Sequence, residues 1–120
     1  MDTAAAIAAV QQNLTPDLLR GRWRKQTKSA HPLEGHCYVA AEALFHLLGF
    51  QWKPMCAVYE DEGGKATHWW LVNRFTGEIA DPTREQYLPD SPPYHLGKGC
   101  GFLTRTPSKR AQIVLKRILS

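Results

Sequence analysis

The sequence of 120 residues has no apolar run near the ~20 residues that a membrane-spanning helix needs. The apolar residues 4–10 follow Asp2, whereas a secretory signal would carry Lys or Arg at that position. We therefore predict an N-terminal helix here, no contact with a membrane, and a cytoplasmic protein.

Cysteine is scarce and odd in number, with three residues at positions 37, 56 and 100. This count lacks the spacing of a small disulfide scaffold. No Cys-x-x-Cys or His-x-x-x-His pair is present, and the neighbours His36 and Cys37 diverge on a helix or an extended chain. We therefore expect no metal site and no cofactor.

A strong excess of one charge sign is also lacking, since the chain is only mildly basic. The 15 Lys and Arg residues against 11 Asp and Glu leave a formal charge of +4, with no long basic run. A solvated basic surface explains this balance better than a nucleic-acid partner. The length suits a single domain over residues 1–120, and no internal repeat interrupts it.

Helix signals occur at both ends and in the middle of the chain. Thr3 is placed to cap a first helix that continues to about Gln12, and a short helix is expected from Thr15-Pro16 to near Gly21, before a basic loop over 22–32. The clearest element follows Gly35 and stops at Gly49, with one apolar stripe at the helical period: Cys37, Ala40, Ala41, Leu44, Leu47 and Leu48. A last helix should begin after Thr106-Pro107, with its own apolar face: Ala111, Val114, Leu115, Ile118 and Leu119.

Three strand signals lie between the helices, over residues 55–60, 66–73 and 78–81. The turns between them predict an antiparallel meander. With a turn centred near Phe75, paired positions sum to about 150, so His68 falls opposite the Asp81–Thr83 region. We therefore predict an α+β fold with helices packed on a small antiparallel sheet.

The order Cys37, His68, Asp81 matches a thiol nucleophile at a helix start, a general base and an orienting acid. A helix N-terminus stabilises a thiolate, and an imidazole can take its proton. Each residue also has an ordinary structural interpretation: a small buried thiol, a strand histidine bonded to a carbonyl, and a turn-forming aspartate. The shared order and the hairpin pairing favour the catalytic interpretation.

Residues flanking these three are candidates for substrate binding. The neighbour His36 and the aromatic pair Trp69 and Trp70 can shape a groove, although one tryptophan should face the core. Gly99 and Cys100 belong to a loop-rich stretch over 85–101, where glycine lets a backbone approach a ligand closely.

Several blocks of the sequence resemble the YunG-like small proteins of bacteria and phages, over roughly residues 30–115: His36-Cys37-Tyr38-Val39-Ala40-Ala41-Glu42-Ala43-Leu44, His68-Trp69-Trp70-Leu71, Asp81-Pro82-Thr83 with Gln86, Gly99-Cys100-Gly101-Phe102-Leu103-Thr104 and Pro107-Ser108-Lys109-Arg110-Ala111. More distantly, the chain resembles the papain-like and transglutaminase-like cysteine-hydrolase core. That resemblance implies Cys37 as nucleophile at a helix N-terminus, His68 as base and Asp81 as orienter. The glutamine that papain-like enzymes often place before the cysteine has no counterpart in residues 30–33, which leaves the Cys37 backbone amide as the default oxyanion donor.

The sequence thus leads to a cysteine hydrolase or acyl-transfer enzyme. Its expected substrate is an amide, isopeptide or thioester of a protein or peptide, and a host protein is one candidate. The alternative is a non-enzymatic, phage-type binding protein that inhibits a host protein on the same fold. The basic last helix and the loop at 89–99 suit that second role.

Overall fold

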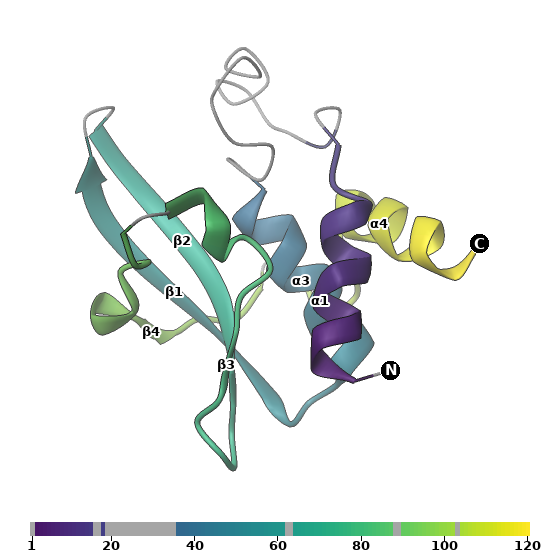
Figure 1. Ribbon diagram of the computed structural model, residues 1–120, viewed down its shortest axis with the longest axis horizontal. Coiled ribbons are helices and arrows are strands. Elements are labelled where there is room, and N and C mark those ends of the chain that lie inside the picture. The colour runs from purple at the N-terminus through teal and green to yellow at the C-terminus, as the bar shows by residue number, and fades with distance from the viewer. Residues whose placement is uncertain (1, 16–17, 19–35, 62–63, 88–89, 103) are drawn as a thin grey trace.

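The computed structural model describes residues 2–15, 18, 36–61, 64–87, 90–102 and 104–120. In this part of the chain the fold is α+β, with helices on one side of a four-stranded antiparallel sheet ordered β3-β2-β1-β4 (Figure 1). The elements are α1 (Thr3–Gln12), α3 (Cys37–Leu48), β1 (Trp52–Asp61), β2 (Gly64–Asn73), β3 (Ile79–Ala80), β4 (Lys98–Gly99) and α4 (Lys109–Leu119). The α+β prediction is confirmed.

Local capping explains where the helices begin and end. The carboxylate of Asp2 accepts a 2.7 Å hydrogen bond from the Ala5 amide, so Asp2 caps α1 in place of Thr3. The bounds predicted for α3 are confirmed, and Gly49 ends it at a φ of +99°, a backbone angle that favours glycine. Ser108 caps α4, which therefore begins slightly later than the sequence suggested.

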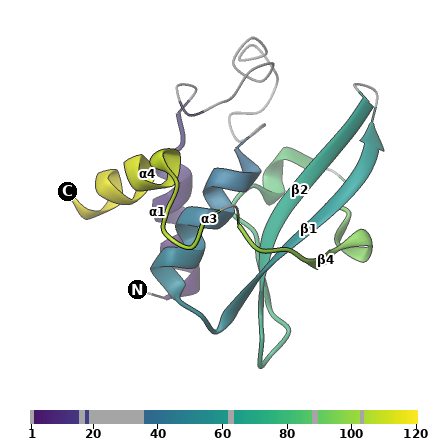
Figure 2. The same ribbon diagram turned by 180° about the vertical axis from the view of Figure 1, so that it is seen from behind.

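The core lies between the three helices and the face of the sheet that they cover (Figure 2). Leu71 of β2 and Trp52 of β1 supply the sheet side of this core. The helices contribute small and branched apolar residues: Ala6, Val10, Val39, Ala40, Ala43, Leu44, Ala111 and Val114. Leu119, which we had assigned to the apolar face of α4, is 79% exposed. It lies in the last turn of the helix, beyond the contacts that bury Ala111 and Val114.

The sheet is larger than the predicted meander. β1 and β2 form a ladder of ten residues each, from Trp52↔Asn73 to Asp61↔Gly64. The third strand, predicted over 78–81, is reduced to the two residues of β3. The sequence missed β4, which pairs with β1 through Met55↔Gly99 and Cys56↔Lys98. Two residues in a stretch rich in Pro and Gly give no alternating pattern to detect.

β2 carries different side chains on its two faces, as the alternation predicted. Leu71 joins the helical core, and the ring of Trp69 meets that of Tyr38 from α3 edge-on at 4.9 Å. His68 and Trp70 occupy the opposite face, where they stack on each other. The helices therefore cover one face, and the chain after β3 supplies the rings that cover His68 on the other.

Two predictions fall on residues that the structure does not describe. The short helix proposed from Thr15-Pro16 to near Gly21 lies outside the described residues except for Thr15 and Leu18, and Leu18 is buried. The loop predicted over 22–32 lies entirely outside them. Among the described residues, no helix combines the length and the apolar character that crossing a membrane would require.

Candidate active site

His68 and Asp81 form a buried hydrogen-bonded pair. The register Leu71↔Ala80 between β2 and β3 carries His68 to the region of Asp81 and Thr83, as the hairpin arithmetic predicted. His68 Nε2 lies 2.6 Å from Asp81 Oδ2, and the two side chains are 0% and 1% exposed. Their predicted proximity is confirmed.

The carboxylate of Asp81 is held by three further donors. Its Oδ1 accepts from the backbone N–H of Thr83 at 3.1 Å and from the Thr83 hydroxyl at 3.4 Å. Its Oδ2, which also faces His68, accepts from the Tyr94 hydroxyl at 2.8 Å. A carboxylate with this many donors is fixed in orientation.

The second nitrogen of the His68 ring has a different environment. Nδ1 is buried and has no hydrogen-bond partner among the residues that the structure describes. Because an ionised Asp81 can only accept, Nε2 is the nitrogen that carries the proton. Nδ1 is then left with its lone pair and is available as a base.

Cys37 opens α3 and lies beside the edge of β2. Its thiol donates a 3.3 Å hydrogen bond to the carbonyl oxygen of Thr67, the residue directly before His68. The peptide groups of Leu71 and Asn73 face β3, and the two-residue period of a strand gives Thr67 and Trp69 the same direction. Pairing with β3 ends at Leu71. Beyond that point, the Cys37 thiol donates a hydrogen bond to a carbonyl oxygen on the edge of β2.

Desolvation dominates the electrostatics of this thiol, although the residue as a whole is half-buried. Desolvation raises the pKa of Cys37 from its ordinary value of 9.0 to about 11, with a smaller upward contribution from the charge of Asp81. Backbone N–H groups of Trp69, Tyr38 and Cys37 itself act in the opposite direction and lower the pKa. In the resting protein Cys37 is therefore a neutral thiol at neutral pH, and a base is needed to activate it.

Aromatic rings enclose the imidazole. The ring of Trp70 stacks on His68 at 5.5 Å with an interplanar angle of 24°, and the ring of Tyr87 meets it edge-on at 4.8 Å. The Tyr87 hydroxyl lies 2.7 Å from that of Tyr59 on β1. Sequence reasoning missed Tyr87 and Tyr94. The available signal was the presence of two tyrosines in the long connection that follows Asp81.

The other residues predicted to bind substrate are only partly near this pair. His36 is 1% exposed, and its Nε2 lies 2.9 Å from the carbonyl oxygen of Thr15, a placement typical of a structural histidine. Trp70 is 1% exposed and supports His68 from within. Trp69 is half-buried against Tyr38 and Phe102, on the same face of the sheet as α3.

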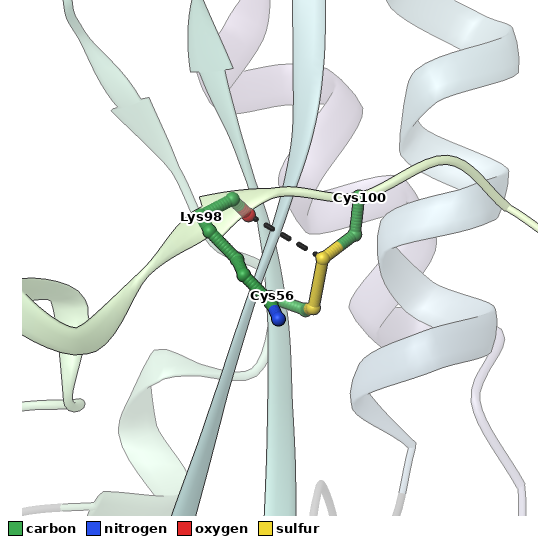
Figure 3. The surroundings of a disulfide bond; sticks show 3 residues. All are labelled: Cys56, Lys98 and Cys100. Carbon is green, nitrogen blue, oxygen red and sulfur yellow. Dashed lines mark hydrogen bonds between the residues drawn. A yellow bond between two sulfur atoms is a disulfide. The ribbon is translucent and has the colours of Figure 1, made fainter.

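Gly99 and Cys100 lie across β1 from β2, the strand that carries His68. Gly99 belongs to β4, which pairs with β1 in the described sheet, whereas Cys37 contacts β2. Cys100 forms a disulfide with Cys56 of β1 across a Cα–Cα distance of 5.9 Å (Figure 3). The cysteine count and spacing argued against a disulfide framework, and this bond contradicts that expectation. The register Cys56↔Lys98 brings the two cysteines together although 44 residues separate them.

Among the described residues, no group of three or more His, Cys, Asp or Glu side chains is arranged to hold a metal ion. Comparison of the chain with family models, curated proteins and solved structures finds no match. The roles of Cys37, His68 and Asp81 therefore have to be argued from the geometry of the site alone.

Proposed function

We propose that the protein is a cysteine-dependent hydrolase or acyl-transfer enzyme with Cys37 as nucleophile, His68 as general base and Asp81 as the residue that orients the base. Its substrate would be an amide, isopeptide or thioester of a protein or peptide. One observation carries this proposal: Asp81 holds Nε2 of a buried His68 at 2.6 Å, while Nδ1 of the same ring has no hydrogen-bond partner among the described residues and can accept a proton.

The chemistry starts with a proton transfer. The thiol leaves the Thr67 carbonyl and turns to Nδ1 of His68, which takes its proton. The thiolate then attacks the substrate carbonyl and forms a covalent acyl-enzyme thioester, and the imidazolium returns the proton to the leaving amine or thiol. Water or an acceptor amine, deprotonated by the same imidazole, releases the acyl group.

Two features support this sequence of steps. Asp81 stabilises the imidazolium that forms when His68 takes the proton, since the carboxylate is fixed beside Nε2. The backbone N–H groups of Cys37 and Trp69 act on the sulfur. Backbone donors at that place are suited to stabilise the oxyanion that develops on the attacked carbonyl.

Labelling of Cys37 by chloroacetamide at neutral pH, read by intact mass, tests the proposal. Cys56 and Cys100 do not compete, because they form a disulfide. His68→Gln should slow labelling by at least about tenfold, since each unit of pKa changes the thiolate fraction tenfold. His46→Gln is the matched control: this half-buried histidine of α3 lies outside the site and should leave the rate unchanged. A folded His68→Gln variant that is labelled as fast as wild type would overturn the proposal that the protein is a cysteine-dependent enzyme.

A specific observation also favours the alternative, a non-enzymatic protein that binds and inhibits a host protein. A neutral thiol with a pKa of about 11 that donates to a backbone carbonyl is the state of an inert structural cysteine. Under this alternative, labelling is slow in wild type and independent of His68. Binding would then involve the basic face of α4, and Lys109→Glu with Lys116→Glu should abolish it.

A cytoplasmic location remains a prediction, and the disulfide counts against it. Disulfides persist mainly in oxidising compartments and are rare in the cytosol. Rapid alkylation of intact cells, followed by mass analysis of the protein, decides the matter. Three alkylated cysteines indicate a reducing compartment, whereas a single alkylated Cys37 indicates an oxidising one.

A further inference from the structure

Tyr94 contacts the predicted triad from a segment of the chain that lies beyond the β2–β3 hairpin. Its hydroxyl donates to Oδ2 of Asp81 at 2.8 Å, the same oxygen that lies 2.6 Å from His68 Nε2. The other oxygen, Oδ1, accepts hydrogen bonds from the amide and the hydroxyl of Thr83, which follows Asp81 closely in the chain. Of the donors to Oδ2, Tyr94 is the one that does not belong to the β2–β3 hairpin.

The segment that carries Tyr94 lies directly on Trp70. The rings of Tyr94 and Trp70 meet edge-on at 5.1 Å. A Cβ atom added to Gly97 would clash with the ring of Trp70, so glycine is needed for this close approach. Trp70 in turn stacks on His68, so one set of ring contacts joins the Tyr94 segment to the imidazole.

The far end of this segment is fastened to β1. The Cys100 amide donates to the Pro54 carbonyl oxygen at 3.1 Å, and β4 pairs with Met55 and Cys56. The disulfide between Cys56 and Cys100 adds a covalent link at the same place (Figure 3). These three attachments hold residues 98–100 against β1. Tyr94 is close to them along the chain, because only the rest of its helical turn (Tyr94–Leu96) and Gly97 intervene.

We propose that Tyr94 is a positioning residue, which holds the Asp81 carboxylate in the orientation that fixes His68, and that the disulfide-anchored segment holds Tyr94 in place. This inference rests on the proposed cysteine chemistry for its meaning, but the contact itself can be tested without it. Burial, the charge of Asp81 and the hydrogen bond to it raise the pKa of the Tyr94 hydroxyl. The group therefore remains a donor throughout the pH range in which a cysteine enzyme would operate.

Tyr94→Phe tests the inference, with Tyr59→Phe as the matched control. Each variant removes one tyrosine hydroxyl and its hydrogen bond, but the Tyr59 hydroxyl meets Tyr87 and not Asp81. The first readout is the NMR signal of the His68 Nε2 proton. In Tyr94→Phe, a loosened carboxylate should move this signal upfield and speed its exchange with water, while Tyr59→Phe leaves it in place. The second readout, chloroacetamide labelling of Cys37, should slow by about tenfold, because hydrogen bonds to charged groups are among the strong ones.

The outcomes separate the two proposals. A His68 proton that stays in place or moves downfield in Tyr94→Phe overturns the positioning role, because the hydroxyl would then be a bystander or a competitor for Oδ2. An equal upfield shift in Tyr59→Phe overturns it too, since the effect would be general loosening. If the proton moves upfield as expected but labelling is insensitive to both Tyr94→Phe and His68→Gln, Tyr94 holds the pair and the enzyme proposal fails. A Cys56→Ser/Cys100→Ser variant tests the anchor: an upfield shift supports it, and an unchanged signal shows that the β4 pairing alone suffices.

Discussion

Glu42 of α3 receives two hydrogen bonds from Ser108, the residue that caps α4. Its Oε2 accepts from the Ser108 amide at 2.8 Å and its Oε1 from the Ser108 hydroxyl at 2.6 Å. Glu42 is fully buried, so we expect Glu42→Gln to lower the free energy of unfolding by about 1–3 kcal/mol, the range for disturbing a buried hydrogen-bonded group. Urea denaturation of Glu42→Gln, Ser108→Ala and the double variant measures this. Strictly additive losses would show that the two residues are not coupled.

Asp81→Asn should affect chemistry and folding together. An amide in place of the carboxylate has one acceptor oxygen for four donors, so either Thr83 or the pair His68 and Tyr94 loses its partner. We expect a loss of about 1–3 kcal/mol in stability. A larger effect is expected on the reactivity of Cys37. In serine proteases the same Asp→Asn change in the triad lowers kcat by about four orders of magnitude. A variant that melts and labels like wild type would reduce Asp81 to a turn residue.

The pH dependence of Cys37 separates an activated thiol from a resting one. In His68→Gln the labelling rate should rise about tenfold per pH unit towards a plateau near pH 11, because the thiol pKa is about 11. Wild type should show an additional component near neutral pH that requires His68. A single rise with a plateau near pH 11 in both proteins would indicate that no ion pair forms.

The raised pKa of the Cys37 thiol also predicts that the stability cost of removing this thiol depends on pH. Because the pKa of Cys37 is raised from 9.0 to about 11 on folding, its contribution to stability is fully present below pH 9 and is lost as the pH rises through about 11. Cys37→Ala should cost about 1 kcal/mol at pH 7, within the usual range for a point change. The difference from wild type should shrink between pH 9 and 11. Denaturant titrations at a series of pH values measure it, and a pH-independent difference would contradict the raised pKa.

The disulfide should contribute more to stability than any of these side chains. It closes a loop with a sequence separation of 44, for which the loss of chain entropy in the unfolded state predicts about 4 kcal/mol. Thermal melts of wild type with and without a dithiol reductant measure this, and Cys37→Ala run in parallel shows whether the third cysteine contributes. An unchanged melting temperature after confirmed reduction would show that β4 pairing holds the segment without the bond.

How much the sequence could predict depends on how local the cause was. The start of α3 at Cys37 follows from a helical stripe, and the meeting of His68 and Asp81 follows from one turn and the two-residue period of strands. Tyr94 was out of reach, because its position depends on a segment that lies on Trp70 and is fastened to a strand far away in the sequence.

The burial of Glu42 also could not be predicted from the sequence, because it depends on a residue far away in the chain. Helical spacing alone puts Glu42 off the apolar stripe of α3 and four residues before His46, a position at which a solvated polar pair is expected. The structure buries it instead, because the N-terminus of α4 supplies two donors to its carboxylate. Periodicity along one helix carries no information about a partner 66 residues away.

The position of the Cys37 thiol on β2 also bears on how molecules of this protein meet one another. A strand edge with unpaired peptide groups is a template for the strand of a second molecule, and such pairing leads to aggregation. Here β3 covers the edge only as far as Leu71, and the thiol occupies the Thr67 carbonyl just beyond it. The thiol that we propose as nucleophile therefore also occupies one acceptor on this strand edge, and we expect Cys37→Ala to leave the Thr67 carbonyl oxygen open to the strand of a second molecule.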